Sequence, residues 1–156
     1  MSSPLDITQV SDGLWIGTTP SVADYERLRG LGIGLVINMR IEKRLARDPH
    51  QPGLDILWLP TIDWPWFPIP MRLLWRGVRQ ARQAFRAGCG VLAHCAGGRH
   101  RSVAMAAAIL IARGLSATEA MQLIASQRKT ADPYAYYIKS RILRFSRQWQ
   151  THPITI

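Results

Sequence analysis

A cysteine and an arginine stand six positions apart around two consecutive glycines, and these residue types together can act on a phosphate ester. A thiolate attacks phosphorus, and the planar guanidinium of arginine binds two phosphate oxygens side by side. Cys95 is therefore the predicted nucleophile, which would form a phosphocysteine intermediate, and Arg101 is the predicted phosphate ligand. The whole segment reads His94-Cys95-Ala96-Gly97-Gly98-Arg99-His100-Arg101-Ser102.

The stretch between Cys95 and Arg101 has the composition of a phosphate cradle. A loop that closes around a phosphate turns its N–H groups inward, and Gly97 and Gly98 permit the dihedral angles and the close approach that this requires. A helix predicted to begin near Ser102 directs its N-terminal N–H groups and its positive dipole end to the same place. Beside a helix N-terminus and a guanidinium, the pKa of a cysteine falls from about 8.5 to roughly 3.5–7.5. We expect Cys95 to be mostly thiolate at neutral pH.

The other residues of the segment have predicted supporting roles. Ser102 would donate its hydroxyl to the sulfur and help the thiolate leave, and His94 would order the loop through hydrogen bonds to backbone carbonyls. Arg99 and His100 can both be cationic, which favours a substrate with additional negative charge, but a salt bridge or a hydrogen bond that stiffens the loop would suit them equally well. The residues predicted to contact substrate are Ala96, Gly97, Gly98, Arg99, His100 and Arg101.

A structural interpretation of the same residues is a buried core thiol, an ordinary strand-to-helix turn and a surface arginine. The pattern His-Cys-x-x-Gly-x-x-Arg-Ser would arise by chance in a chain of this size on the order of 10⁻⁵ to 10⁻⁴ of the time. The apolar residues on both sides, which predict a strand and then a helix, also favour the phosphate site.

Alternating apolar runs and helical repeats predict an α/β domain that would position this loop. Short apolar runs predict buried strands at 14–16, 34–37, 56–59 and 91–94. Helices are predicted over 71–86, 102–113, 117–128 and 134–149. The Trp- and Pro-rich stretch 63–70 is predicted to be a loop.

A general acid is also required, because the leaving oxygen must gain a proton and the attacking water must later lose one. Asp63 follows the strand that ends near Leu59, so we expect it at the edge of the sheet where the Cys95 loop also emerges. Asp63 is the predicted acid. The alternative is that Asp63 is only a turn or cap residue with no catalytic role. Asp132 is the reserve candidate, and its own alternative is an N-cap ahead of Pro133.

The segment from His94 to Ser102 resembles the signature of the protein tyrosine phosphatase superfamily: His-Cys, five residues, Arg, then Ser or Thr. Over about residues 10 to 147 the chain resembles the dual-specificity branch, and Asp63-Trp64-Pro65 is similar to the acid loop of the larger relatives. The resemblance implies a central, mostly parallel sheet of four to five strands flanked by helices. It also implies a two-step mechanism without a metal or another cofactor.

Composition limits the organisation of the protein. The chain has 156 residues, 47% of them hydrophobic, which predicts a single phosphatase domain over residues 1–156. Neither a signal sequence nor a membrane span is evident, so we expect a cytoplasmic protein, and we expect a monomer. The two cysteines, Cys89 and Cys95, would lie at opposite ends of a strand and remain reduced.

The substrate is not fixed by these residues. The formal charge of +10 would attract phosphoproteins, anionic phospholipids or nucleic acid. Phosphotyrosine protein is the leading prediction and phosphoserine or phosphothreonine protein the second. Gly98-Arg99 resembles the phosphatases that act on phosphatidylglycerophosphate, so phosphoinositide or phosphatidylglycerophosphate substrates stay open, as does an RNA 5′ phosphate. The alternative that is not an enzyme is a phosphate-recognition module that binds without turnover.

Overall fold

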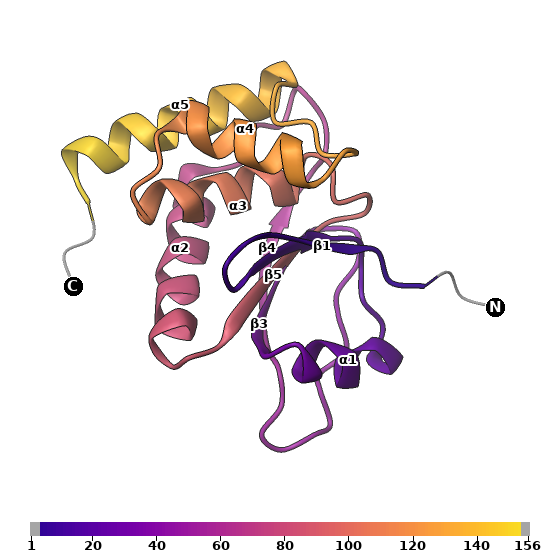
Figure 1. Ribbon diagram of the computed structural model, residues 1–156. Coiled ribbons are helices and arrows are strands. Elements are labelled where there is room, and N and C mark those ends of the chain that lie inside the picture. Colours follow the sequence, from indigo (N-terminus) through magenta and orange to yellow (C-terminus); the bar gives the residue numbers. More distant parts are fainter. Residues whose placement is uncertain (1–3, 154–156) are drawn as a thin grey trace.

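The computed structural model describes residues 4–153, which form a five-stranded sheet between one short helix on one face and four longer helices on the other (Figure 1). The strands are β1 (Ile7–Ser11), β2 (Leu14–Gly17), β3 (Ile33–Arg40), β4 (Asp55–Thr61) and β5 (Gly90–His94). The helices are α1 (Tyr25–Gly30), α2 (Met71–Arg86), α3 (Arg101–Ala112), α4 (Ala117–Gln127) and α5 (Tyr136–Thr151), and a 3₁₀ turn, Val22–Asp24, precedes α1.

The order of the strands in the sheet is β1-β2-β5-β3-β4, with β5 in the centre. Only β1 and β2 pair antiparallel, whereas β2 with β5, β5 with β3 and β3 with β4 pair in parallel. The predicted mostly parallel sheet is thereby confirmed. Because parallel strands end at the same edge, the segments that follow β3, β4 and β5 meet there.

The alternation of side chains along the central strands divides the core between the two faces of the sheet. Val91 and Ala93 of β5 pack in the larger cluster, which includes residues of α2, α3, α4 and α5. Leu92, between them, packs on the other face with Tyr25 and Leu28 of α1. β5 is therefore buried on both faces, which fixes the position of the loop that follows it.

Helix α3 follows that loop and is the most deeply buried helix of the described chain. Its residues from Arg101 to Ile111 are all buried, because small and aliphatic side chains cover every face of the helix between α2, α4 and α5. Its polar first turn, Arg101 and Ser102, is buried as well. These two polar residues consequently enter the site from a rigid element.

The predicted helices agree with the structure to within about two residues at each end, and α2 has the predicted bounds. The N-terminal strand β1 and the short helix α1 were not located by the sequence patterns. β1 is an edge strand in which only Val10 is buried, so its sequence lacks a continuous apolar run.

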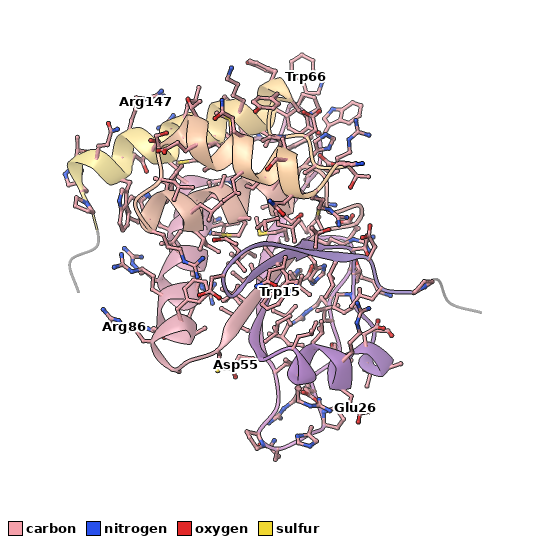
Figure 2. The ribbon with its side chains drawn as sticks, viewed as in Figure 1. Trp15, Glu26, Asp55, Trp66, Arg86 and Arg147 are labelled. Atoms are coloured by element: carbon pink, nitrogen blue, oxygen red, sulfur yellow. The ribbon has the colours of Figure 1, made fainter. Side chains whose placement is uncertain are left out.

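Within residues 4–153, no helix is long and apolar enough to cross a membrane. The polar face of α2 carries a row of arginines, of which Arg72, Arg76, Arg79 and Arg86 are exposed. Figure 2 shows Arg86 at the end of α2 that lies away from α5.

Candidate active site

The loop from Cys95 to His100 connects the central strand β5 to α3, as the sequence predicts. Its anchor is the end of β2: the Cys95 N–H donates to the Gly17 carbonyl at 3.3 Å. Gly98 has a φ of 62° and lies against Gly17, so that a Cβ at position 98 would stand 2.8 Å from the Gly17 backbone. Gly98 therefore has both a conformational and a steric reason to be glycine, whereas a Cβ on Gly97 would meet no atom closer than 3.9 Å.

Cys95 lies at the bottom of this loop with 3% of its surface exposed. Its Sγ is 3.2 Å from the hydroxyl of Ser102. Burial raises the pKa of the thiol, but hydrogen bonds from the Ser102 hydroxyl and from the N–H groups of Ser102 and Arg99, together with the charge of Arg101, outweigh it and lower the pKa below the ordinary value. The site thus favours a thiolate at Cys95.

The guanidinium of Arg101 is held from behind by a carboxylate that the sequence patterns did not identify. Its Nη1 and Nη2 donate to the two oxygens of Glu42 at 2.9 and 3.1 Å, and Nη1 also donates to the Thr61 carbonyl at 2.9 Å. The hydrogen bonds from Arg101 lower the pKa of Glu42 to about 2, so Glu42 is ionised. Within the described chain, the buried Nε has no hydrogen-bond partner, and the edge formed by Nε and Nη2 keeps donors for an anion.

His94 is fully buried, and neither of its ring nitrogens has a hydrogen-bond partner among the described residues. The predicted bonds from His94 to loop carbonyls therefore do not reach hydrogen-bond geometry, although the Cys95 backbone lies close enough to raise the pKa of the imidazole. Burial, with the charges of Arg40 and Arg101, lowers the pKa of His94 to about 3. The imidazole is consequently neutral beneath the loop.

A second arginine, Arg128 at the end of α4, holds the outer part of the loop. Its Nε donates to the Gly98 carbonyl at 2.9 Å and its Nη2 to the Gly97 carbonyl at 3.2 Å. Asp6 accepts from both Nη atoms, and the hydroxyl of Thr8 accepts from Nη1 at 2.9 Å. Because two carbonyls of the loop are turned outward to Arg128, these bonds fix the shape of its outer part.

Asp63 lies in the segment between β4 and α2 and reaches the same end of the sheet. Its Oδ1 accepts a hydrogen bond of 2.6 Å from the hydroxyl of Tyr137, and its Oδ2 is 3.3 Å from Nδ1 of His100 in the loop. Its charge also acts on Arg101. Asp132, the reserve candidate, lies on the far side of His100, with 3.8 Å between its Oδ2 and Nε2 of the histidine. Its Oδ1 accepts from the N–H groups of Tyr134 and Ala135, as a turn residue ahead of α5.

The rim of the loop is open and partly cationic. Ala96, Gly97 and Arg99 are exposed. Trp64, Trp66 and Phe67, which follow Asp63, are also exposed, and Figure 2 shows Trp66 on the outer surface beside α5. These aromatic side chains face solvent and do not cover the core.

The structure brings Cys95, Arg101, Ser102 and Asp63 to one end of the sheet, with His94 beneath them. Sequence reasoning did not find the contacts of Glu42, Arg128 and Tyr137. For Glu42 a signal existed, because it follows β3 at the same edge of the sheet as Asp63. Arg128 carries no comparable signal, because an arginine at the end of a helix is usually a solvent-exposed charge. Among residues 4–153, no group of three or more His, Cys, Asp or Glu side chains could hold a metal ion.

Comparison with known proteins agrees with this geometry. The family model of the dual specificity phosphatase catalytic domain matches residues 14–147. Human dual specificity phosphatase 28 is 31% identical over 131 residues, which cover 83% of this chain and 72% of the relative. Rat dual specificity protein phosphatase 12 is 30% identical over 142 residues, which cover 88% of this chain and 42% of the relative. The crystal structure of a mouse putative dual specificity phosphatase with zinc tungstate has a TM-score of 0.85 at 27% identity, covering 97% of this chain and 92% of that one.

A mostly parallel sheet that presents a Cys-x₅-Arg loop at the N-terminus of a buried helix defines a cysteine-based phosphatase fold. This chain belongs to the dual specificity phosphatase family, as its match to the catalytic-domain model over most of its length shows. The predicted family, fold and enzyme class, a phosphoric monoester hydrolase, are confirmed.

Proposed function

We propose that this phosphatase hydrolyses its substrate through a covalent phosphocysteine on Cys95. The observation that carries the proposal is a buried thiol whose pKa is lowered, at the bottom of a preformed loop and within the field of Arg101. A thiolate there can attack phosphorus, and the loop N–H groups and the helix terminus stabilise the negative charge of the transferred group.

In the first step, the Cys95 sulfur forms a bond to phosphorus as the bond from phosphorus to the ester oxygen breaks. Asp63, in its acid form, gives its proton to that oxygen, and the free alcohol or phenol leaves. The Nε and Nη2 edge of Arg101 is suited to hold two oxygens of the phosphoryl group, because Glu42 binds the adjacent edge, Nη1 and Nη2, and leaves the Nε hydrogen and the second Nη2 hydrogen as donors. Arg101 therefore combines an orientation fixed by Glu42 with donors left for substrate.

In the second step, water attacks phosphorus and the sulfur–phosphorus bond breaks. The Asp63 carboxylate takes a proton from the water, so that the acid form is restored, and inorganic phosphate is released. The Ser102 hydroxyl, 3.2 Å from Sγ, stabilises the departing thiolate. The neutral His94 has no role in proton transfer here and supports the loop by packing beneath it.

We propose phosphorylated proteins as the substrates, with phosphotyrosine first and phosphoserine or phosphothreonine second. The exposed Trp64, Trp66 and Phe67 beside the acid loop support an aromatic or apolar substrate segment. Exposed Arg99 supports a second negative charge near the reacting phosphate, which an anionic phospholipid also supplies. PTPMT1 in complex with PI(5)P shares the fold with a TM-score of 0.83, but at 23% identity this is a likeness of fold alone. A monomeric, cytoplasmic protein of one domain remains our prediction.

The test is phosphate release from a phosphotyrosine peptide, a phosphoserine peptide, phosphatidylglycerophosphate, phosphoinositides and a 5′-phosphorylated RNA. We expect the phosphotyrosine peptide to be hydrolysed fastest. The Cys95→Ser variant should release no phosphate but should still bind the phosphopeptide. Fastest release from either lipid would reassign the substrate to anionic phospholipids. Fastest release from the RNA would reassign it to nucleic acid. No release from any of the five, with phosphopeptide still bound, would favour a recognition module; normal turnover by Cys95→Ser would refute the mechanism.

A further inference from the structure

The carboxyl of Asp63 has two side-chain partners that the two-step reaction leaves without a role. Tyr137, in the first turn of α5, donates to Oδ1 at 2.6 Å. His100, the residue of the loop that precedes Arg101, has its Nδ1 3.3 Å from Oδ2. The carboxyl therefore joins three segments: the acid loop, the phosphate loop and the last helix.

The two partners also contact each other. The Tyr137 hydroxyl is 3.1 Å from Nδ1 of His100, and the two rings are 5.5 Å apart at an angle of 53°. Each of the three side chains thus contacts both of the others. A closed group of this kind allows fewer combinations of side-chain rotamers than a single hydrogen bond does.

Asp63 needs such restraint because its own backbone provides little. Residues 62–70 form neither a helix nor a strand, and the Asp63 side chain is 38% exposed. A general acid must come within hydrogen-bond reach of the leaving oxygen, and a displacement of about 1 Å can cost on the order of 100-fold in rate.

We propose that Tyr137 and His100 are positioning residues for Asp63, which hold its carboxyl at the rim of the phosphate loop and leave Oδ2 as the oxygen that carries the transferred proton. The inference rests on the proposed role of Asp63 as the general acid. Neither residue gains or loses a proton in it.

The choice of Oδ2 follows from the hydrogen bonds. In the acid form of Asp63, Oδ1 accepts from Tyr137 and is the carbonyl oxygen, so the proton lies on Oδ2. Nδ1 of His100 lies 3.3 Å from Oδ2, so the imidazole limits where this second oxygen can move. The proton passes from Oδ2 to the ester oxygen in the first step, and a water proton returns to Oδ2 in the second.

Tyr137→Phe removes the donor to Oδ1 and keeps the ring. We expect kcat/KM, which reports the first step, to fall about tenfold for phenyl phosphate, whose leaving group needs protonation, and to change little for p-nitrophenyl phosphate, whose leaving group does not. The matched control is Tyr136→Phe on the adjacent residue, which is 81% exposed and should leave both rates unchanged.

His100 provides a second, independent variant. His100→Ala removes the contact with Oδ2 and should reduce kcat/KM for phenyl phosphate selectively. His100→Asn places an amide group near the position of Nδ1 and should recover part of that loss. His100→Leu fills the space without a polar atom and should recover none of it, whereas equal recovery by both would indicate a space-filling role. The melting temperature of each variant distinguishes a misplaced Asp63 carboxyl, which leaves it unchanged, from a destabilised fold, which lowers it.

Asp63→Asn is the reference in a double-mutant cycle. If Tyr137 and His100 act through Asp63, adding either change to Asp63→Asn should produce no further loss for phenyl phosphate. Full additivity in the cycle, or single variants as active as Tyr136→Phe, would overturn the positioning role while the acid role of Asp63 stands. An equal loss of kcat/KM for both esters in Asp63→Asn alone would refute the acid role and this inference with it.

Discussion

The pKa of the Cys95 thiol is the result of opposing effects. Burial alone would favour the neutral thiol, because a low-dielectric environment disfavours charge. Hydrogen bonds from Ser102 and Arg99 and the charge of Arg101 act in the other direction and prevail. All of these groups belong to the start of α3 or to the loop immediately before it, so nucleophile activation depends on the junction of loop and helix.

Ser102→Ala tests this balance. The variant loses the hydroxyl that lies 3.2 Å from Sγ, so the thiolate is less stabilised and the pKa of Cys95 rises. We expect the pH profile of the alkylation rate with iodoacetamide to move to higher pH. The slower departure of the thiolate should also increase the burst of leaving group relative to steady-state turnover.

Cys89 is a second free thiol, partly exposed, so the alkylation experiment is made in a Cys89→Ser background. Ser126→Ala, a serine-to-alanine change at an exposed position on α4, is the matched control. An unchanged alkylation profile in Ser102→Ala would show that the backbone N–H groups and Arg101 alone activate the thiol.

The sequence could predict the side chains that perform chemistry, because Cys95, Arg101 and Ser102 lie within eight consecutive positions. It could not predict how they are held. Glu42 is 59 positions from Arg101, and Arg128 is 30 from Gly98, so these contacts depend on how the segments fold together. The partners of Asp63 are equally remote, with Tyr137 74 positions away.

The loop between β5 and α3 contains two adjacent glycines with different reasons to be glycine. Gly98 combines a positive φ with a close approach to the backbone of Gly17, whereas Gly97 has open space around its missing Cβ. Gly98→Ala should therefore distort the cradle and reduce kcat/KM by about 100-fold, the order expected when catalytic groups are misplaced by about 1 Å. Steady-state kinetics with p-nitrophenyl phosphate and inhibition by orthovanadate would measure the effect.

Gly97→Ala is the comparison for that experiment, since it adds the same methyl group one position earlier. We expect a distinctly smaller loss of kcat/KM and of vanadate affinity, because its nearest neighbour would be 3.9 Å away. Equal losses in the two variants would contradict the steric explanation and indicate that both loop amides need glycine for another reason.

Patterns of apolar residues predicted the elements that carry the site, because β5 and α3 are buried and therefore apolar on every face. They did not locate β1, which is paired on one side only and alternates with polar residues. The start of α5 was predicted two residues early, because Asp132 forms a turn with Tyr134 and Ala135 before the helix begins at Tyr136.

The molecule as a whole carries twice as many basic as acidic side chains, 20 against 10. Several acids are already paired: Asp6 with Arg128, Asp48 with Arg29, and Glu42 with Arg101. The surface therefore retains an excess of positive charge, which should attract anionic substrates over distances longer than a hydrogen bond.

We expect kcat/KM for an acidic phosphotyrosine peptide to fall several-fold as the ionic strength rises from about 0.01 to 0.15 M, where the screening length shortens from about 30 to 8 Å. The same phosphotyrosine within a neutral peptide controls for effects of salt on the catalytic centre and should change much less. Identical salt dependence for the two peptides would show that the net charge does not steer substrate.

The contacts of Arg128 also bear on when, during synthesis of the chain, the protein can first become an active phosphatase. The nucleophile and its loop are synthesised about 30 residues before Arg128, and Asp6, which orients that arginine, 122 residues before it. A growing chain therefore possesses every reacting group while the carbonyls of Gly97 and Gly98 still lack their partner. We expect the loop to take its catalytic shape only when the segments that carry Asp6 and Arg128 have met, so a truncated chain that ends before Arg128 should show no phosphatase activity although it contains the complete motif.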